Sequence, residues 1–362
     1  MSEISAPLPT GSVIGILGGG QLGRMLIPPA ARLGYRCAVF SPEEDCPASH
    51  LTDRCIVADY TDMAALERFA GMVDVVTFEF ENIPLASVER LAALRPVRPG
   101  PAALAQTQDR LTEKRFLNET CGIPTARCRA IDGPGDIAAA IAALGAPLLL
   151  KTRRMGYDGK GQVRISADGD PAQAWESLGR APAIAEAVVP FDREISVVLA
   201  RGADGRTVAY PPGENRHAGG ILRRTHLPAG IPDALAARAS EMARRVAAEL
   251  DYIGVLALEM FVTDGPGEVL ANEIAPRVHN TGHWTLDGAV TDQFEQHIRA
   301  IAGLPLGAPD ALGRVRMENL IGADIERRAD LLADPRARVH DYGKGEARPG
   351  RKMGHVTWLD AD

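Results

Sequence analysis

The stretch GVLALEMFVTDGPGEVLANEIAPR, residues 254–277, contains two apolar segments separated by turn-forming residues. The first segment predicts a strand at 254–262 and the second a strand at 266–274, with a tight turn at Asp264–Gly267. Strands joined by a tight turn pair antiparallel, so residues far apart in this stretch become neighbours on one sheet face. The stretch therefore predicts a β-hairpin within a second α/β unit of the chain, which runs from about 125 to 305.

Glu259 and Glu273 are the acidic residues of this hairpin that matter most for function. Antiparallel pairing can put them side by side, where two like charges destabilise each other unless a cation lies between them. Oxygen ligands supplied by few protein groups fit Mg²⁺ that is shared with phosphates. The alternative is a pair of exposed sheet acids, which the apolar setting LALEMF disfavours. The hairpin thus predicts a magnesium site beside a phosphorylated ligand.

A glycine-rich loop lies upstream, in LLLKTRRMGYDGKGQ at 148–162. A buried strand ends at Lys151, and after three loop glycines the chain returns into a strand at 162–166. The P-loop pattern G-x-x-x-x-G-K-[ST] is absent. Glycines between two strands can form a flap whose N–H groups close over phosphates. The density of charged residues around the loop favours a flap over a plain hairpin turn.

The segment QDRLTEK, residues 108–114, belongs to a helix predicted at about 109–120. Arg110 and Lys114 are four residues apart and lie on one helical face, so both cations can reach one polyanion. A solvated helical face is the alternative interpretation.

The segment AEAVVPFDREIS, residues 185–196, contains Glu186 near the end of one strand and Glu194 at the start of the next. A short apolar linker with exposed backbone groups suits the edge of an adenine, and a carboxylate suits ribose hydroxyls. Ordinary acids at strand ends are the alternative.

The first hundred residues alternate strands and helices, which predicts a parallel, doubly wound sheet. The unit opens with VIGILGGGQLGRML, 13–26, whose Gly18, Gly20 and Gly23 fit G-x-G-x-x-G. Such a loop brings backbone and a helix N-terminus close to a ligand, but alone it is weak evidence for a dinucleotide. An NAD site also needs an acidic residue at the tip of the second strand, and Glu43 lies beyond that tip. An NAD-dependent dehydrogenase is therefore kept only as an alternative.

The other elements follow from apolar periodicity. We expect helices at 21–33, 62–70 and 234–250, and strands at 13–17, 37–40, 56–57, 73–78, 193–200 and 315–320.

Two basic or histidine-rich segments complete the candidates. GKGEARPGRKMGH, 343–355, supplies Lys344, Arg351 and Lys352 in a loop that could bind a phosphate monoester, with a floppy basic tail as the alternative. His279 and His283 have the spacing of a zinc pair. They lack the Glu of H-E-x-x-H and a third ligand, which disfavours zinc.

Composition is that of a globular protein: 362 residues, 46% apolar and 24% charged. A net charge of −7 argues against nucleic-acid binding, and no apolar run predicts a membrane helix or a signal peptide. The five cysteines form no C-x-x-C pair, which favours reduced thiols and a cytoplasmic location.

Taken together, these segments resemble the ATP-grasp superfamily and, more narrowly, its N5-carboxyaminoimidazole ribonucleotide synthase family. The resemblance runs from end to end, through GGGQLGRM, FEFEN, RRMGYDGKGQ, NEIAPRVHNTGHW and RPGRKMGH. It implies a mixed α/β and α+β fold in three domains. These are an N-terminal doubly wound pre-ATP-grasp domain at 1–108, a two-lobed ATP-grasp domain at 109–305, and a small C-terminal domain at 306–362 that contains the basic loop.

The resemblance also implies site residues. ATP would contact Arg110, Lys114, Lys151, Gly156, Tyr157, Asp158, Gly159, Lys160, Gly161, Gln162, Glu186, Ala187, Val188, Val189, Glu194, His217, Asn272 and Glu273. Glu259 and Glu273 would hold Mg²⁺, as two ions. The ribonucleotide would lie against Gln21, Leu22, Glu81 and Asn280, with its phosphate held by Lys344, Arg351 and Lys352. Catalysis would involve Lys151, Tyr157, Asp158 and Arg277.

The implied reaction is ATP-dependent carboxylation of aminoimidazole ribonucleotide by bicarbonate through carboxyphosphate, in purine biosynthesis. The formate-dependent glycinamide ribonucleotide transformylase is the main rival, and a non-catalytic nucleotide-binding module is a further alternative. The resemblance implies small-molecule substrates, a homodimer, and neither nucleic acid nor membrane as a partner.

Overall fold

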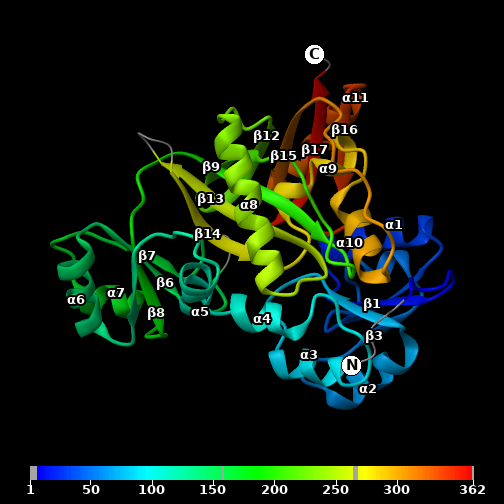
Figure 1. The fold of residues 1–362 in the computed structure, drawn as a ribbon, viewed down its shortest axis with the longest axis horizontal. Coiled ribbons are helices and arrows are strands. Elements are labelled where there is room, and N and C mark those ends of the chain that lie inside the picture. The colour runs from blue at the N-terminus through cyan, green and yellow to red at the C-terminus, as the bar shows by residue number, and fades with distance from the viewer. Residues whose placement is uncertain (1–5, 157–158, 264–267, 361–362) are drawn as a thin grey trace.

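The structure is a computed structural model of the chain, and it describes residues 6–156, 159–263 and 268–360. The N-terminal unit, blue in Figure 1, is a parallel sheet in the order β3-β2-β1-β4. Its strands are β1 (Val13–Leu17), β2 (Arg36–Ser41), β3 (Cys55–Val57) and β4 (Val75–Phe78). Its helices are α1 (Gln21–Arg32), η1 (Ser49–Leu51), α2 (Met63–Met72) and α3 (Leu85–Ala92).

Both faces of this sheet are covered, which explains why β1 is apolar at every position. Ile14 and Ile16 pack in a core with Leu26 of α1, whereas Leu17 packs in a second core with Phe69 of α2. The doubly wound parallel sheet predicted from the sequence is confirmed.

A helical connection leads from this unit to the rest of the chain. It consists of α4 (Pro101–Thr107), α5 (Arg110–Arg115) and a single π-helical turn, η2 (Phe116–Thr120). The helix predicted at about 109–120 is thus present, but its second half is wound more loosely than an α-helix.

A small antiparallel lobe follows, with strand order β5-β8-β6-β7. Its elements are β5 (Cys128–Ile131), α6 (Pro134–Leu144), β6 (Leu148–Thr152), β7 (Gln162–Ile165), α7 (Pro171–Ser177) and β8 (Ala183–Ala187). β6 and β7 are the two strands predicted on either side of the glycine-rich loop.

A large antiparallel sheet forms the centre of the molecule, in the order β14-β13-β9-β11-β12-β15-β17-β16, with β10 beside β9. The strands are β9 (Phe191–Arg201), β10 (Thr207–Ala209), β11 (Gly213–Ala218), β12 (Ile221–Leu227), β13 (Gly254–Thr263), β14 (Val269–Ala275), β15 (Arg314–Ile321), β16 (Ala337–Asp341) and β17 (Lys352–Asp360). The helices are α8 (Asp233–Glu249), η3 (Asn280–Gly282), α9 (Thr285–Gly288), α10 (Gln293–Ala302), η4 (Gly322–Arg327) and α11 (Arg328–Ala333). The turn predicted at 264–267 lies outside the described residues.

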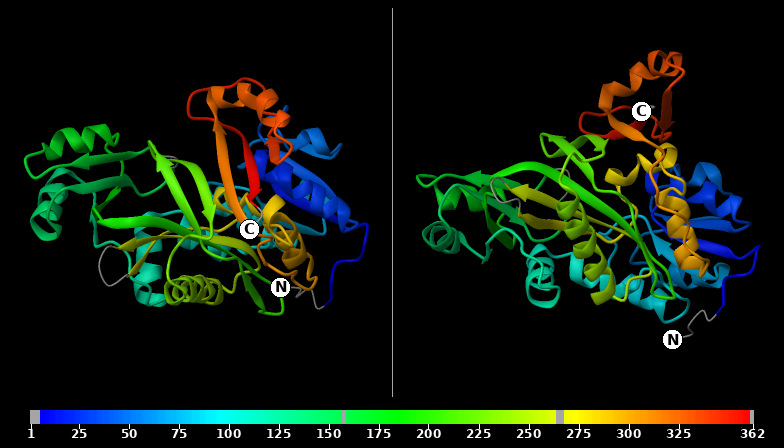
Figure 2. Two further views of the ribbon diagram at one scale, coloured as in Figure 1. Left: turned by 90° about the horizontal axis from the view of Figure 1, so that it is seen from above. Right: turned by 45° about the horizontal axis from the view of Figure 1, so that its top comes forward.

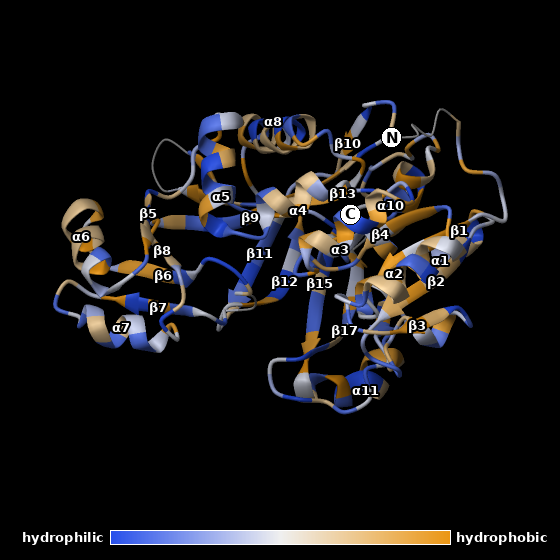
Figure 3. Cartoon of the chain, turned by 90° about the horizontal axis from the view of Figure 1, so that it is seen from below, coloured by the Kyte–Doolittle hydropathy of each residue, from blue (hydrophilic) through white to orange (hydrophobic). Residues whose placement is uncertain are grey.

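The C-terminal strands extend this central sheet, because β15 pairs with β12 and β17 pairs with β15 (Figure 2). The basic loop is shorter than predicted, since Lys352 already opens β17. Figure 3 shows the contrast between the hydrophobic β1, which is buried at every position, and the hydrophilic β11, which is only partly buried. Over the part of the chain that the structure describes, no helix is long and apolar enough to cross a membrane.

Candidate functional site

The two predicted hairpin acids are direct neighbours. Glu259 of β13 pairs with Glu273 of β14, as the sequence predicts. Leu258 and Met260, on either side of Glu259, pack toward α8, so Glu259 itself faces away from that helix. The pair therefore lies on the face of the central sheet that is turned away from α8.

The charges around the two acids are unequal. Burial tends to raise the pKa of Glu273, but the Arg110 guanidinium, 2.9 Å from its Oε2, holds that pKa below the usual range. Burial and the charge of Glu273 raise the pKa of Glu259, and the positive charges of His217 and Lys352 offset this rise only in part. A divalent cation beside Glu259 would relieve this imbalance. Among residues 6–156, 159–263 and 268–360, no group of three His, Cys, Asp or Glu side chains forms a closed metal site, so further ligands would come from phosphate or water.

A β-bulge interrupts the pairing of β13 and β14 next to the two acids. The β13–β14 register passes from Glu259↔Glu273 to Met260↔Ala271, which leaves Asn272 as an extra residue. Helix α5 holds this bulge on both sides. The Lys114 Nζ donates to the Asn272 carbonyl at 2.7 Å, and the buried Glu113 accepts the Ile274 N–H at 2.6 Å. This role of Glu113 was not predicted, because no sequence pattern indicates that a single acid on a helix accepts a hydrogen bond from a distant strand.

A buried charge cluster connects the small lobe to α5. The Lys151 Nζ donates to Glu186 at 2.6 Å, and the Lys114 Nζ lies 3.3 Å from the other Glu186 oxygen. Burial tends to raise the pKa of Glu186, but the two lysines outweigh it and lower that pKa to about 2. Lys114 is only 2% exposed, so its charge acts mainly through Glu186 and the bulge.

The described ends of the glycine-rich loop contact residues outside the small lobe. The Arg110 Nη2 lies 3.4 Å from the Gly156 carbonyl, which places the start of the loop beside Glu273. Gly159 and Gly161 both have positive φ, and a Cβ on Gly159 would come within 3.0 Å of the Gly219 carbonyl in the β11–β12 turn. The predicted residues Tyr157 and Asp158 lie outside the described residues. Lys160 and Gln162 are exposed at the end of this loop.

The predicted adenine and ribose segment follows the small lobe. Ala187 ends β8, Val188 is exposed, and Val189 leads into β9. Glu194 of β9 forms an ion pair with His217 of β11. Burial tends to lower the pKa of His217, but Glu194 and the nearby Glu259 raise it overall.

A carboxylate of the chain fills the N-terminal glycine loop. Glu79, only 7% exposed, accepts the Gly20 N–H at 2.6 Å and the Gly23 N–H at 2.9 Å. Burial raises its pKa, although these two N–H bonds oppose the effect. A Cβ on Gly18 would lie 2.3 Å from the Glu79 Cγ. The anion position at this helix N-terminus is thus already occupied, and this contradicts the dinucleotide alternative.

The residues predicted to contact the ribonucleotide come from α1, the loop after β4 and η3. Gln21 and Leu22 begin α1 and lie between Gly20 and Gly23, the two residues whose N–H groups donate to Glu79. Glu81 accepts two hydrogen bonds from the Arg277 guanidinium, one of them 2.9 Å long. The Asn280 amide donates to the Asn319 side chain at 3.0 Å.

The basic loop at the C-terminal end of the chain adds positive charge near Glu79 and Glu259. The positive charge of Lys344 acts on Glu79, and that of Lys352 acts on Glu259. The Arg351 Nη1 donates to the Lys344 and Glu346 carbonyls at 3.1 Å each, which ties the loop to itself. Residues from all three predicted domains therefore meet at one site.

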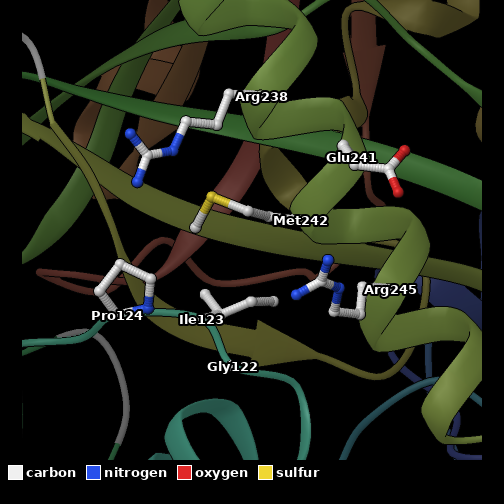
Figure 4. A pocket seen from close by; sticks show the side chains of 7 residues that line it. All are labelled: Gly122, Ile123, Pro124, Arg238, Glu241, Met242 and Arg245. Atoms are coloured by element: carbon white, nitrogen blue, oxygen red, sulfur yellow. The ribbon is translucent and has the colours of Figure 1, made fainter.

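The His279–His283 spacing and one pocket remain to be described. His279 contacts Thr281 and Glu259, whereas His283 is fully buried against Gln293 and His355. The two histidines have the spacing of a zinc pair, but they do not face a common position where both could bind one metal ion. Figure 4 shows a pocket between α8 and the turn before β5, on the sheet face opposite to Glu259; it is lined by Gly122, Ile123, Pro124, Arg238, Glu241, Met242 and Arg245. None of the predicted site residues lines this pocket.

Comparisons with protein families cover most of the chain. Residues 12–108 match a ribonucleotide synthetase preATP-grasp domain, residues 116–294 an ATP-grasp domain, and residues 316–362 a phosphoribosylaminoimidazole carboxylase C-terminal domain. The N5-carboxyaminoimidazole ribonucleotide synthase of Brucella melitensis is 50% identical over 352 residues, 97% of each chain. That of Pseudomonas aeruginosa is 45% identical over 96% of this chain and 95% of its own.

Solved structures that resemble this chain belong to the same family. An ADP complex of an N5-carboxyaminoimidazole ribonucleotide synthetase has a TM-score of 0.95 at 42% identity, covering 99% of this chain and 95% of its own. The Aspergillus clavatus synthase in complex with ADP and 5-aminoimidazole ribonucleotide has a TM-score of 0.90 at 32% identity, covering 97% and 94%. The chain therefore belongs to the N5-carboxyaminoimidazole ribonucleotide synthase family and is an ATP-dependent ligase with the ATP-grasp fold.

Proposed function

We propose that this protein uses ATP to carboxylate 5-aminoimidazole ribonucleotide with bicarbonate, giving N5-carboxyaminoimidazole ribonucleotide, ADP and phosphate. One observation carries the proposal: a carboxylate pair suited to magnesium, Glu259 and Glu273, faces the same site as the basic residues Lys344 and Lys352. A site with both features can hold a nucleoside triphosphate and a phosphorylated substrate together.

ATP would lie between the small lobe and the central sheet. Lys151, Arg110 and the flap residues Gly156–Gln162 would contact its phosphates, Ala187–Val189 its adenine, and Glu194 with His217 its ribose. Glu259 and Glu273, with Asn272 beside them, would hold two Mg²⁺ ions, and the paired oxygen donors fit that hard cation. When bound, Mg²⁺ neutralises phosphate charge and keeps the transferred group in line.

The ribonucleotide would lie on the N-terminal side. The Aspergillus clavatus relative was crystallised with ADP and this nucleotide together, which supports such a ternary site here. Gln21, Leu22 and Asn280 would contact the sugar and base, and Lys344, Arg351 and Lys352 the 5′-phosphate. Glu81 is already held by Arg277, so its carboxylate would meet the base in a fixed orientation.

The chemistry is a phosphoryl transfer followed by an acyl transfer. A bicarbonate oxygen attacks the γ-phosphorus, the bond to ADP breaks, and carboxyphosphate forms. The exocyclic amine then attacks the carboxyl carbon of carboxyphosphate and expels phosphate, or carboxyphosphate first breaks down to CO₂ and phosphate and the amine adds to CO₂. In both routes the amine loses a proton as the carbamate forms. Carboxyphosphate is short-lived in water, so the flap must exclude solvent. Asp158 would orient the amine and take part in removing its proton, a task that the released phosphate could share.

A phosphate-release assay with each pair of substrates tests the proposal. Phosphate should form fastest with bicarbonate and aminoimidazole ribonucleotide, and the aromatic amine should disappear in step with it. Faster turnover with formate and glycinamide ribonucleotide would identify the rival transformylase instead. Asp158→Ala should abolish consumption of the amine in a folded protein, and wild-type consumption would contradict its assigned role. The homodimer and the cytoplasmic location stay predictions.

A further inference from the structure

A buried pair of asparagine side chains joins η3 to β15. The Asn280 Nδ2 donates to the Asn319 Oδ1 at 3.0 Å, and the Asn319 Nδ2 donates back to the Asn280 Oδ1. Asn280 begins η3 and is 7% exposed, whereas Asn319 lies in β15 and is 1% exposed. The two amides therefore form a reciprocal pair inside the protein. Of the two, only Asn280 was predicted from the sequence as a site residue.

Asn319 is a polar residue on an apolar face of its strand. Val315 and Met317 precede it on the same face of β15, and both pack in a hydrophobic core with Trp284. A buried amide lowers the free energy of unfolding unless its polar atoms are hydrogen-bonded. An apolar side chain at this position would avoid that cost, so packing alone does not account for an asparagine here.

The backbone carbonyl of Leu222 determines how the pair is oriented. This carbonyl, in β12, accepts a hydrogen bond from the Asn319 Nδ2 at 3.0 Å. Because a carbonyl oxygen can only accept, the nitrogen of the Asn319 amide has to face it, and the Asn319 oxygen is then left to accept from Asn280. A backbone group of β12 thereby fixes the orientation of both side-chain amides.

The pair lies next to groups of the candidate site. His279, immediately before Asn280, contacts Glu259 at 3.5 Å. Lys352, a predicted phosphate-binding residue, pairs with Ile321, two residues after Asn319 in β15. The pairing uses one N–H and one lone pair of the Asn280 amide and leaves the second of each for another partner. Asn280 can therefore donate to a ligand and accept from it in one fixed orientation.

We infer that Asn319 is a positioning residue, which holds the side-chain amide of Asn280 in the orientation that contacts the ribonucleotide. This inference rests on the proposed function, in which Asn280 contacts the sugar and base. It adds a residue that acts through Asn280 without touching the substrate. Loss of one hydrogen bond between neutral groups weakens binding by roughly two- to tenfold. Removal of the Asn319 amide should therefore raise the KM for the ribonucleotide by that factor.

Steady-state kinetics of two Asn319 variants test the inference. Asn319→Leu keeps the branched shape of the side chain and removes its hydrogen bonds to Asn280 and Leu222. Asn319→Ser is smaller, and its hydroxyl is too short to bridge both partners, so it keeps the test valid if leucine prevents folding. Both variants should raise the KM for aminoimidazole ribonucleotide by roughly two- to tenfold and leave the KM for ATP unchanged.

A double variant separates positioning from a general loss of stability. Asn280→Ala alone should raise the same KM, and Asn280→Ala combined with Asn319→Leu should raise it no further, because Asn319 acts only through Asn280. Gln296→Met is the matched control. Gln296 is also a fully buried amide, and it makes two hydrogen bonds to the Gly307 backbone, at 2.6 and 2.9 Å. This control should lower stability to urea and leave both KM values unchanged.

The outcomes distinguish the inference from the proposed function. An unchanged KM for the ribonucleotide in a folded Asn319 variant would overturn the inference, as would an equal rise in the KM for ATP. Additive effects of Asn280→Ala and Asn319→Leu, or an equal rise in Gln296→Met, would also overturn it. A wild-type protein that consumes no aminoimidazole ribonucleotide would instead overturn the proposed function.

Discussion

Replacing Gly20 by alanine tests what the N-terminal glycine loop is for. Gly20 has φ −74°, which any residue adopts, so alanine there carries no backbone strain. Its Cβ, however, would lie 2.5 Å from the Glu79 Oε1 and 2.9 Å from its Oε2. The carboxylate would have to move away from the Gly20 and Gly23 N–H groups, from which it now accepts hydrogen bonds.

The cost follows from the bonds that are lost. Hydrogen bonds to a charged group contribute about 1.5–3 kcal/mol each, so displacing Glu79 from two of them should lower the free energy of unfolding by about 3 kcal/mol or more. With Glu79→Ala already present, no carboxylate opposes the new methyl group. Gly20→Ala should then cost only the lower preference of alanine for a helix N-cap, about 1 kcal/mol or less. The two changes should therefore be coupled by about 2 kcal/mol.

Urea unfolding of both single variants and the double variant measures this coupling. Gly100→Ala is the matched control, because Gly100 is also an N-cap with φ −70° and a Cβ there would meet no atom within 4 Å. Additive effects of Gly20→Ala and Glu79→Ala would refute the reasoning. So would a cost of Gly20→Ala no greater than that of Gly100→Ala.

Three further predictions concern the site. Glu273→Gln should lower turnover by roughly 100-fold or more through loss of a magnesium ligand; near-normal activity at saturating Mg²⁺ would contradict that assignment. Arg351→Ala should raise the KM for aminoimidazole ribonucleotide by roughly 10-fold or more and leave that for ATP unchanged; the opposite pattern in steady-state kinetics would refute the phosphate contact. Burial alone would lower the pKa of His217, but carboxylates including Glu194 raise it above 6.5. A group with a raised pKa stabilises the fold below its unfolded pKa, and this contribution is lost as pH rises through the folded pKa. The stability difference between the wild type and Glu194→Gln should therefore be larger near pH 6 than near pH 9, and a pH-independent difference in urea unfolding would count against the pair.

Features with a local signature were predictable from the sequence. The β1 strand, α1, the flap strands and the Glu259–Glu273 pairing all follow from apolar periodicity, glycine placement and a short turn. Each of these depends on residues close together in the chain, so physical rules for single elements are sufficient.

Features that depend on distant partners were not predictable. Glu79 and Glu81 are two residues apart in FEFEN, and no local rule indicates that one fills the glycine loop while the other pairs with Arg277. The pairing of β12 with β15 joins strands separated by almost ninety residues, and Gln108 joins two loops that meet only in the folded protein. Such contacts are decided by tertiary packing.

Oxygen transfer from labelled bicarbonate tests the central claim most directly. If a bicarbonate oxygen attacks the γ-phosphorus, turnover with [¹⁸O]bicarbonate and aminoimidazole ribonucleotide should give phosphate that carries one bicarbonate oxygen, as read by mass spectrometry. The aromatic amine should be consumed in the same amount. Phosphate without the label, formed at the same rate, would mean that water attacks ATP and would contradict a carboxyphosphate route.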